Sequence, residues 1–231
     1  FGIFAERMHC YHGSGSSYAM SDFRGVPGDA SRPLGGIIEI GGIGTPIQEG
    51  TTYFGALHTP AGARLKSMMR QGPGRDRSVT MSMFGEDAPQ LTNYVDLDPQ
   101  IRDINGLPAA RFTYRAHPFE QQAQAVYGPK LVDILMAAGA KYAAILPQGL
   151  IPGTAHMHGT LRFGNDPKTS VCRADGRFHD VGNLYACGGA LFPTGSGFNP
   201  TLTIATLAKY VAGEMLFPGS PRRALPPLPT L

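Results

Sequence analysis

Long apolar runs are missing from this sequence. No stretch of its 231 residues approaches the roughly 18 to 20 consecutive apolar residues that a membrane-spanning helix needs. A surplus of one charge is also missing, because the formal net charge is only +3 and basic and acidic residues are interspersed. Nucleic-acid binding normally requires a clustered basic patch. We therefore predict no membrane span and no nucleic-acid partner.

Cysteine is scarce as well. The three cysteines, Cys10, Cys172 and Cys187, are odd in number and far apart, so we predict no disulfide framework. A reducing, cytoplasmic compartment fits this usage. The chain opens without an initiator Met and without the charged start and apolar stretch of a signal peptide. We expect it to begin inside a longer protein.

Several sequence signatures of cofactor and metal sites are absent too. A GxGxxG sequence after a strand holds the nucleotide half of a dinucleotide cofactor, and only GGIGTPIQEG at 41–50 comes near it, with the wrong spacing. No Cys-x-x-Cys or HExxH sequence occurs, so no metal site is predicted. A serine hydrolase is disfavoured because there is no G-x-S-x-G sequence.

Loops and short strands dominate what is present. The chain has 31 glycines and 20 prolines, which favour long loops, and 42% hydrophobic residues, which favour a globular fold. Short strand-like pieces between turn residues predict an antiparallel sheet, and a further strand is expected at 183–187. The sheet pieces lie at 36–40, 79–84, 93–97 and 110–114, with a short helix expected at 59–69.

Two longer helices are predicted towards the C-terminus. Apolar residues recur at helical spacing over 118–138 and stop at Gly139, a typical residue after a helix end, while Pro129 should kink or split this helix. The last helix is expected from Pro200 to about residue 216, with Asn199 as its cap. Its first backbone N–H groups would face an electron-rich group.

Two histidines lie two residues apart, at 156 and 158. On an extended segment both rings point to the same side, as metal ligands or as structural groups would. Histidine can also accept a proton at neutral pH, which makes it a candidate general base. From the residues alone, the structural and catalytic interpretations both stay open.

Four stretches near the C-terminus, taken together, resemble a known family signature. They are HMHGTLRFG at 156–164, NLYACGGA at 183–190, FPT at 192–194 and NPTLTI at 199–204. Their order and spacing resemble the C-terminal pattern of the glucose-methanol-choline (GMC) family of flavin-dependent oxidoreductases. Residues 93–114 also resemble the family's entry into its substrate-domain sheet. One departure is Gly188, where the family often has Asp.

The resemblance implies a mixed α/β fold. Residues 1–150 would form a substrate-binding domain with an antiparallel sheet flanked by helices. Residues 151–216 would form the C-terminal segment of a Rossmann-like FAD-binding domain, followed by a proline-rich tail at 217–231. The implied cofactor is FAD, and its missing nucleotide-binding half would lie on an N-terminal portion or on a partner subunit.

The resemblance also assigns residues to the site. His156 would act as the base for the substrate hydroxyl, and Asn199 would orient the same oxygen without accepting its proton. His158 is interpreted as structural, or as a residue that supports the site from behind the contacting groups. The implied cofactor-binding residues, which would approach the ribityl chain or the pyrimidine end of the flavin ring, are Gly188, Gly189, Ala190, Asn199, Pro200, Thr201 and Leu202.

The predicted function is oxidation of a CH–OH group of a sugar, polyol or other alcohol by hydride transfer to flavin. Polar and aromatic residues around 9–23 favour a polyhydroxylated substrate. The alternative is a non-catalytic carbohydrate-binding or scaffold subunit that has kept the family fold. The presence of both His156 and Asn199 favours catalysis, because a scaffold needs neither.

Overall fold

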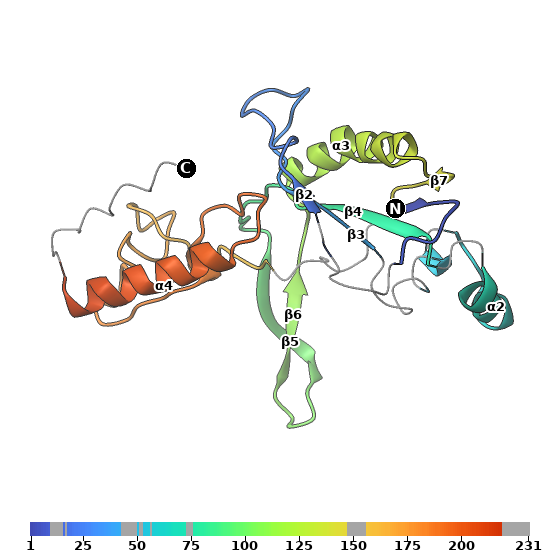
Figure 1. The fold of residues 1–231 in the computed structure, drawn as a ribbon. Helices are drawn as coiled ribbons and strands as arrows, with labels where there is room; N and C mark the ends of the chain where they lie inside the picture. Colours follow the sequence, from blue (N-terminus) through green and yellow to red (C-terminus); the bar gives the residue numbers. More distant parts are fainter. Residues whose placement is uncertain are drawn as a thin grey trace. The chain divides into compact units, whose positions relative to one another are not determined.

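The chain forms a mixed α/β structure of two compact units, as predicted for the fold class (Figure 1). The computed structural model describes residues 1–9, 16, 18–42, 50, 53–55, 57–72, 76–146 and 156–218. The first unit comprises Phe1–Thr154 and Ser196–Phe198, and the second comprises Ala155–Gly195 and Asn199–Leu231. The chain therefore passes between the units three times. Substrate binding by one part and FAD binding by the other stay predictions.

A five-stranded antiparallel sheet forms the centre of the first unit, and this confirms the predicted sheet type. Its strands, in spatial order, are β2 (Tyr18–Met20), β3 (Ile38–Gly42), β4 (Ser78–Met83), β1 (Gly2–Ile3) and β7 (Tyr142–Ala143). Strand β3 begins two residues later than expected. Ile37, just before it, donates its backbone N–H to Gly197 O at 2.8 Å.

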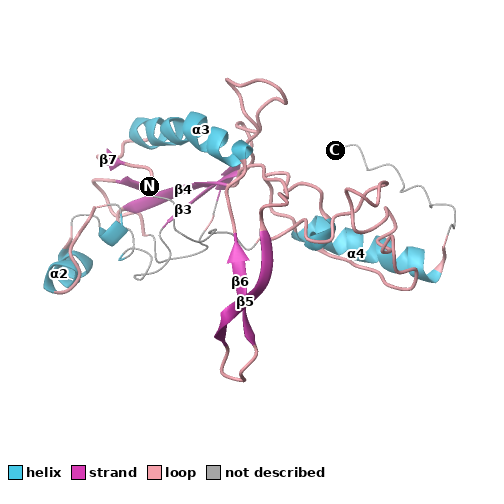
Figure 2. Cartoon of the chain, turned by 180° about the vertical axis from the view of Figure 1, so that it is seen from behind, coloured by secondary structure: helices cyan, strands magenta, loops and turns pink. Residues whose placement is uncertain are grey.

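The two strands predicted near residues 93–114 form a sheet of their own (Figure 2). Strands β5 (Tyr94–Arg102) and β6 (Pro108–Thr113) are antiparallel, with a register shift between Leu97 and Arg102. An ion pair between Asp96 and Arg111 crosses the two strands. Arg111 also lowers the pKa of the Asp96 carboxyl by hydrogen bonding to it.

Helix α3 (Pro118–Ala137) packs against β1 and β7 and supplies much of the first unit's core. Its buried residues are Ala123, Tyr127 and Leu135. Of the two effects predicted for Pro129, a split is wrong, because α3 is continuous through it, and a kink stays a prediction. Proline removes the hydrogen bond to the carbonyl four residues back. Here both Pro129 and residue 125 lie on the exposed side, where water can bond to that carbonyl.

The end of α3 confirms the expected role of Gly139. Its φ of 99° is a left-handed conformation that side chains rarely adopt. Gly139 N–H donates to Met136 O at 3.0 Å, and Ala140 N–H donates to Leu135 O at 3.1 Å, which is a Schellman ending. A second glycine delays the start of α2 (Ala63–Gln71), because Gly62, with a φ of 99°, cannot join the helix predicted from residue 59.

The three residues Ser196–Phe198 are held by the first unit. Ser196 N–H donates to Glu86 Oε1 at 2.7 Å, and Gly197 O accepts from Ile37 as described. A Cβ atom at Gly36 would lie 2.2 Å from Gly197 O and 2.0 Å from Phe84 O. The backbones therefore approach so closely at this point that no side chain fits.

The second unit is built around Cys172, Leu191 and Val211, which form its buried core. Helix α4 (Thr201–Leu216) supplies Val211, and the short 3₁₀ helix η1 (Gly189–Leu191) supplies Leu191. Cys172 is buried and free, and burial raises the pKa of its thiol. Cys187 is exposed and also free.

The strand predicted at 183–187 is wrong. This segment pairs with residues 176–178 only in a short hairpin, through Phe178 N–H to Leu184 O at 3.0 Å and Ala186 N–H to Gly176 O at 2.9 Å. Too few residues face one another to extend the ladder. Of the predicted proline-rich tail, residues 219–231 lie outside the described part of the chain.

Candidate functional site

Three of the motif segments meet inside the second unit. Leu161 N–H donates to Ala190 O at 2.9 Å, which joins the segment after His156 to η1. A Cβ atom at Gly189 would lie 3.0 Å from Met157 O and 3.6 Å from Ile204 Cδ1, in the first turn of α4. Gly189 therefore lies between the segment at Met157 and the first turn of α4, although these two segments are more than 40 residues apart in sequence.

Glycine conformation shapes the backbone at this meeting point. Gly188 has a φ of 91°, and a Cβ atom there would meet no other atom within 4 Å. Gly159, inside the HMHGT stretch, has a φ of 85° and is buried. These two glycines allow backbone turns that other residues would strain. Beside Gly188 the turn leaves open space next to the main chain.

The start of α4 differs from the predicted cap. Pro200, not Asn199, occupies the cap position, and proline has no side-chain acceptor that could cap the helix. The first bond of this helix runs from Ile204 N–H to Pro200 O at 2.8 Å, so Asn199 precedes the cap position by one residue. The first N–H groups of a helix have no acceptor within it. Leu202, in this first turn, is 81% exposed.

The two histidines of the motif lie on the second unit with Asn199. Burial alternates along the segment, because His156 and His158 are half-buried while Met157 between them is 69% exposed. This alternation indicates that both rings lie on the inner side. Convergence of His156 and Asn199 on one substrate oxygen stays a prediction.

His158 is held by packing more than by hydrogen bonding. A Cβ atom at Gly195 would lie 2.9 Å from His158 Nε2, so the ring rests against the main chain there. His158 Nδ1 is buried without a hydrogen-bond partner in the part of the chain that the structure describes. The structural interpretation of His158 therefore depends on this contact with Gly195.

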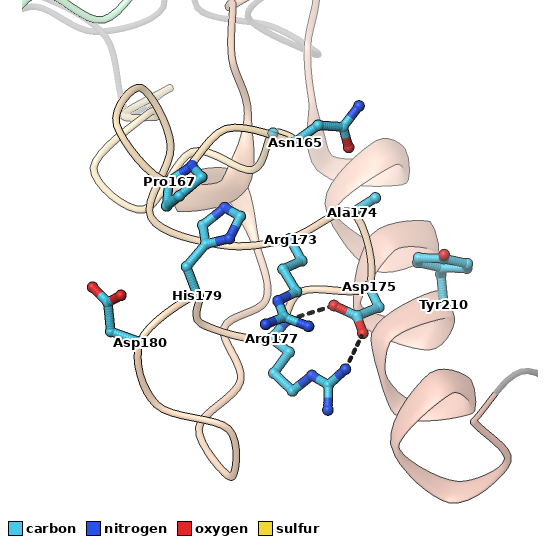
Figure 3. Close-up of a pocket in the computed structure, with 10 residues that line it drawn as sticks. Asn165, Pro167, Arg173, Ala174, Asp175, Arg177, His179, Asp180 and Tyr210 are labelled. Atoms are coloured by element: carbon cyan, nitrogen blue, oxygen red, sulfur yellow. Dashed lines mark hydrogen bonds and ion pairs between the residues drawn. The ribbon is translucent and has the colours of Figure 1, made fainter.

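A pocket of about 650 Å³ lies elsewhere on the second unit (Figure 3). None of the predicted site residues lines it. Sequence reasoning missed it, although basic and acidic residues alternate at 173, 175 and 177. Its lining consists of Gly164, Asn165, Pro167, Arg173, Ala174, Asp175, Arg177, His179, Asp180 and Tyr210.

The imidazole ring of His179, in the lining of this pocket, is held by a hydrogen bond to Ser170. The hydroxyl of Ser170 donates to Asp166 O at 2.7 Å, and the same oxygen lies 2.9 Å from His179 Nε2. Because its only proton is already donated, the Ser170 hydroxyl accepts a hydrogen bond from His179 Nε2–H. Ser170 is therefore not activated as a nucleophile.

The described residues contain neither a cluster of metal ligands nor a membrane-spanning helix. No three His, Cys, Asp or Glu side chains gather there as metal ligands would. None of the helices found there combines the length and apolarity needed to cross a membrane.

Comparison with known proteins gives a consistent class. The chain is 35% identical over 167 residues to 2-methyl-1,2-propanediol dehydrogenase of Mycolicibacterium austroafricanum, which covers 67% of this chain and 30% of that relative. It is 34% identical over 166 residues to paromamine 6'-oxidase of Streptomyces fradiae, covering 68% of this chain and 30% of that relative. Gluconate 2-dehydrogenase flavoprotein of Pantoea cypripedii is 29% identical over 71% of this chain and 28% of that relative.

All three relatives are oxidoreductases by name, and the chain spans about 30% of their length. The family model described as GMC oxidoreductase matches residues 89–208, which include the four motif stretches and the β5–β6 hairpin. The chain belongs to the GMC oxidoreductase family. The resemblance stated from the motifs is confirmed.

Proposed function

We propose that this chain is the C-terminal part of an FAD-dependent oxidoreductase that oxidises a CH–OH group of a sugar, polyol or other alcohol. The observation that carries the proposal is the contact among the HMHGT segment, η1 and the first turn of α4. Relatives named as dehydrogenases and oxidases of a diol and of sugar-like molecules support the substrate class.

The residues at the meeting point fit a flavin. Gly188 leaves open space beside the main chain, so a ribityl chain could approach residues 188–190 closely. The start of α4 has N–H groups at Thr201 and Leu202 without an acceptor inside the helix, and it carries the positive end of the helix dipole. We propose that these residues hold the flavin, with Asn199 and Pro200 beside them. When bound, FAD would supply the hydride acceptor.

The chain's own residues would handle the proton and the substrate oxygen. We assign His156 the role of base, which takes the hydroxyl proton onto an imidazole nitrogen as the alcohol is oxidised. The Asn199 amide would hold the same oxygen in place, and it has no basic atom to compete for the proton. The first N–H groups of α4 would stabilise negative charge that builds up in front of them.

The nucleotide half of the cofactor would need another segment. No GxGxxG sequence follows a strand within these 231 residues, and the near-candidate at 41–50 lies mostly outside the described residues. We propose that an N-terminal portion of the same polypeptide, or a partner subunit, supplies this half. The polar segment around 9–23, proposed to favour a polyhydroxylated substrate, is itself undescribed at 10–15 and 17.

The experiment that tests the proposal is a visible absorption spectrum of the complete purified protein. An alcohol or a sugar is then added under anaerobic conditions, and the spectrum is recorded again. We expect the absorption band of oxidised flavin, and we expect the substrate to bleach it. A colourless, stably folded protein would support the non-catalytic subunit instead.

A substitution at the start of α4 tests the proposed flavin contact. We expect Leu202→Asp to slow flavin reduction about fivefold relative to Leu202→Asn. A carboxylate at this position would repel the negative charge that develops on the flavin, and the roughly fivefold effect corresponds to the usual energy of a charge at a helix end. Leu202 is exposed, so neither variant should disturb folding. Stopped-flow absorbance measures the rate. Equal rates in the two variants would contradict the proposed facing of this helix.

A further inference from the structure

We propose that the pocket around Arg173 and Arg177 is a binding site for a small-molecule oxyanion, meaning a carboxylate or a phosphate group. The pocket is separate from the proposed oxidation site, because none of residues 156, 188–190 or 199–202 lines it. The proposal does not depend on the chain's being an oxidoreductase.

An excess of hydrogen-bond donors in the pocket carries the proposal. Each arginine side chain offers several N–H donors and no acceptor. Arg173 has no ion-pair partner within the described segments. Arg177 Nε is buried without a partner there, and its Nη2 atom lies 3.6 Å from Asp175 Oδ2, beyond an ordinary hydrogen bond. Most of these donors therefore have no protein acceptor in the described part of the chain and are available to a ligand.

The acidic residues of the pocket do not cancel this excess. Asp175 Oδ1 already accepts the backbone N–H of Arg177 at 3.1 Å. Asp180 lies at the side, with its carboxylate pointing away from both guanidinium groups (Figure 3). One carboxylate thus stands beside two guanidinium groups, which leaves the centre of the pocket cationic.

The local backbone holds the two arginines on one rigid turn. Arg173 N–H donates to Arg177 O at 2.7 Å, and Gly176 N–H donates to Arg173 O at 2.9 Å. The ring of His179 is fixed by Ser170, as described above, and forms another wall. Little side-chain or loop ordering would accompany binding, apart from that of Arg173 itself.

Guanidinium forks match the geometry of carboxylate and phosphate oxygens, which accept two parallel hydrogen bonds. A neutral hydroxyl ligand would use fewer of the free donors, and a cation would be repelled. The size of the pocket, about 650 Å³, is ample for a small metabolite bearing such a group.

The test is calorimetric titration of the complete protein, with and without saturating FAD, using inorganic phosphate and acetate at constant ionic strength. We expect at least one anion to bind with a Kd of about 1 mM, which is what two charge-assisted hydrogen bonds at an open site supply. Tighter binding of phosphate would indicate a phosphate ester as the ligand, and tighter binding of acetate would indicate a carboxylic acid.

Variants separate a built site from general charge attraction. Arg173→Gln should raise the Kd at least tenfold, and Arg173→Lys, which keeps the charge but loses the fork, should raise it severalfold. Lys168→Gln removes the same charge from a neighbouring exposed position outside the lining and should change the Kd less than twofold.

Three results would overturn the proposal. The first is the absence of binding of either anion up to 50-fold above about 1 mM. The second is an equal loss of affinity in Arg173→Gln and Lys168→Gln. The third is loss of anion binding when FAD is added, which would mean that the pocket holds the cofactor's own phosphates.

Discussion

His156→Ala lowers turnover by about 10² to 10⁴ while the flavin stays bound, if His156 is the base that we propose. Without its imidazole, water has to accept the hydroxyl proton, and water is a poorer and less well-placed base. The half-buried position of His156 makes truncation to alanine tolerable for folding. The measurement is steady-state turnover of the complete protein, with the flavin content of each preparation read from its absorption spectrum.

A rescue experiment distinguishes a lost base from a damaged site. Added imidazole should restore part of the activity of His156→Ala, because it can enter the space left by the side chain. His58→Ala removes an exposed histidine of the first unit, so its turnover should stay within about twofold, and imidazole should have no effect on it. Unchanged turnover in His156→Ala would remove this residue from the mechanism.

Gly36→Ala should lower the free energy of unfolding of the first unit by about 3 kcal/mol or more, near the upper end of what overpacking costs. The new Cβ atom would lie 2.0 Å from Phe84 O and 2.2 Å from Gly197 O. Both oxygens belong to the backbone, so neither can rotate away as a side chain would. The loop around Gly197 must therefore leave its place or β3 must shift. Urea unfolding measures the change.

Gly55→Ala is the matched control for this prediction. It adds the same methyl group to the first unit at a position where no atom lies within 4 Å and where φ is not positive. Its free energy of unfolding should change by less than about 1 kcal/mol. If both variants unfold at the same urea concentration as the unmodified protein, the close approach at Gly36 does not exist in solution.

Elements with a strong local signal were predictable from the sequence. The helical spacing of apolar residues and Gly139 gave α3 and its ending, because periodicity and a left-handed glycine are properties of the nearby chain. The alternation of strands and turns likewise gave the antiparallel pairs β3–β4 and β5–β6. The family motifs identified which segments would gather in the second unit.

Features set by distant partners could not be predicted. The strand expected from residue 36 begins only at Ile38. Gly36 and Ile37 instead contact the loop at 196–198, and the Ile37 N–H donates to Gly197 O. The arginine pocket depends on which donors stay unpaired after folding, and spacing along the chain carries no such information. The cap position of α4 was predicted at Asn199, but the helix begins one residue later and its cap residue is Pro200.

Residues Ser196–Phe198 belong to the first unit although the chain on both sides of them belongs to the second. No single truncation point can therefore separate the two units. A truncation that ends the chain at Thr154 would strip from the first unit the carbonyl that Ile37 binds and the amide that Glu86 binds. A fragment that starts at Ala155 would carry those three residues as an unsupported loop between Gly195 and Asn199. Length changes there would propagate to the first turn of α4, so we expect this short segment to tolerate neither insertion nor deletion.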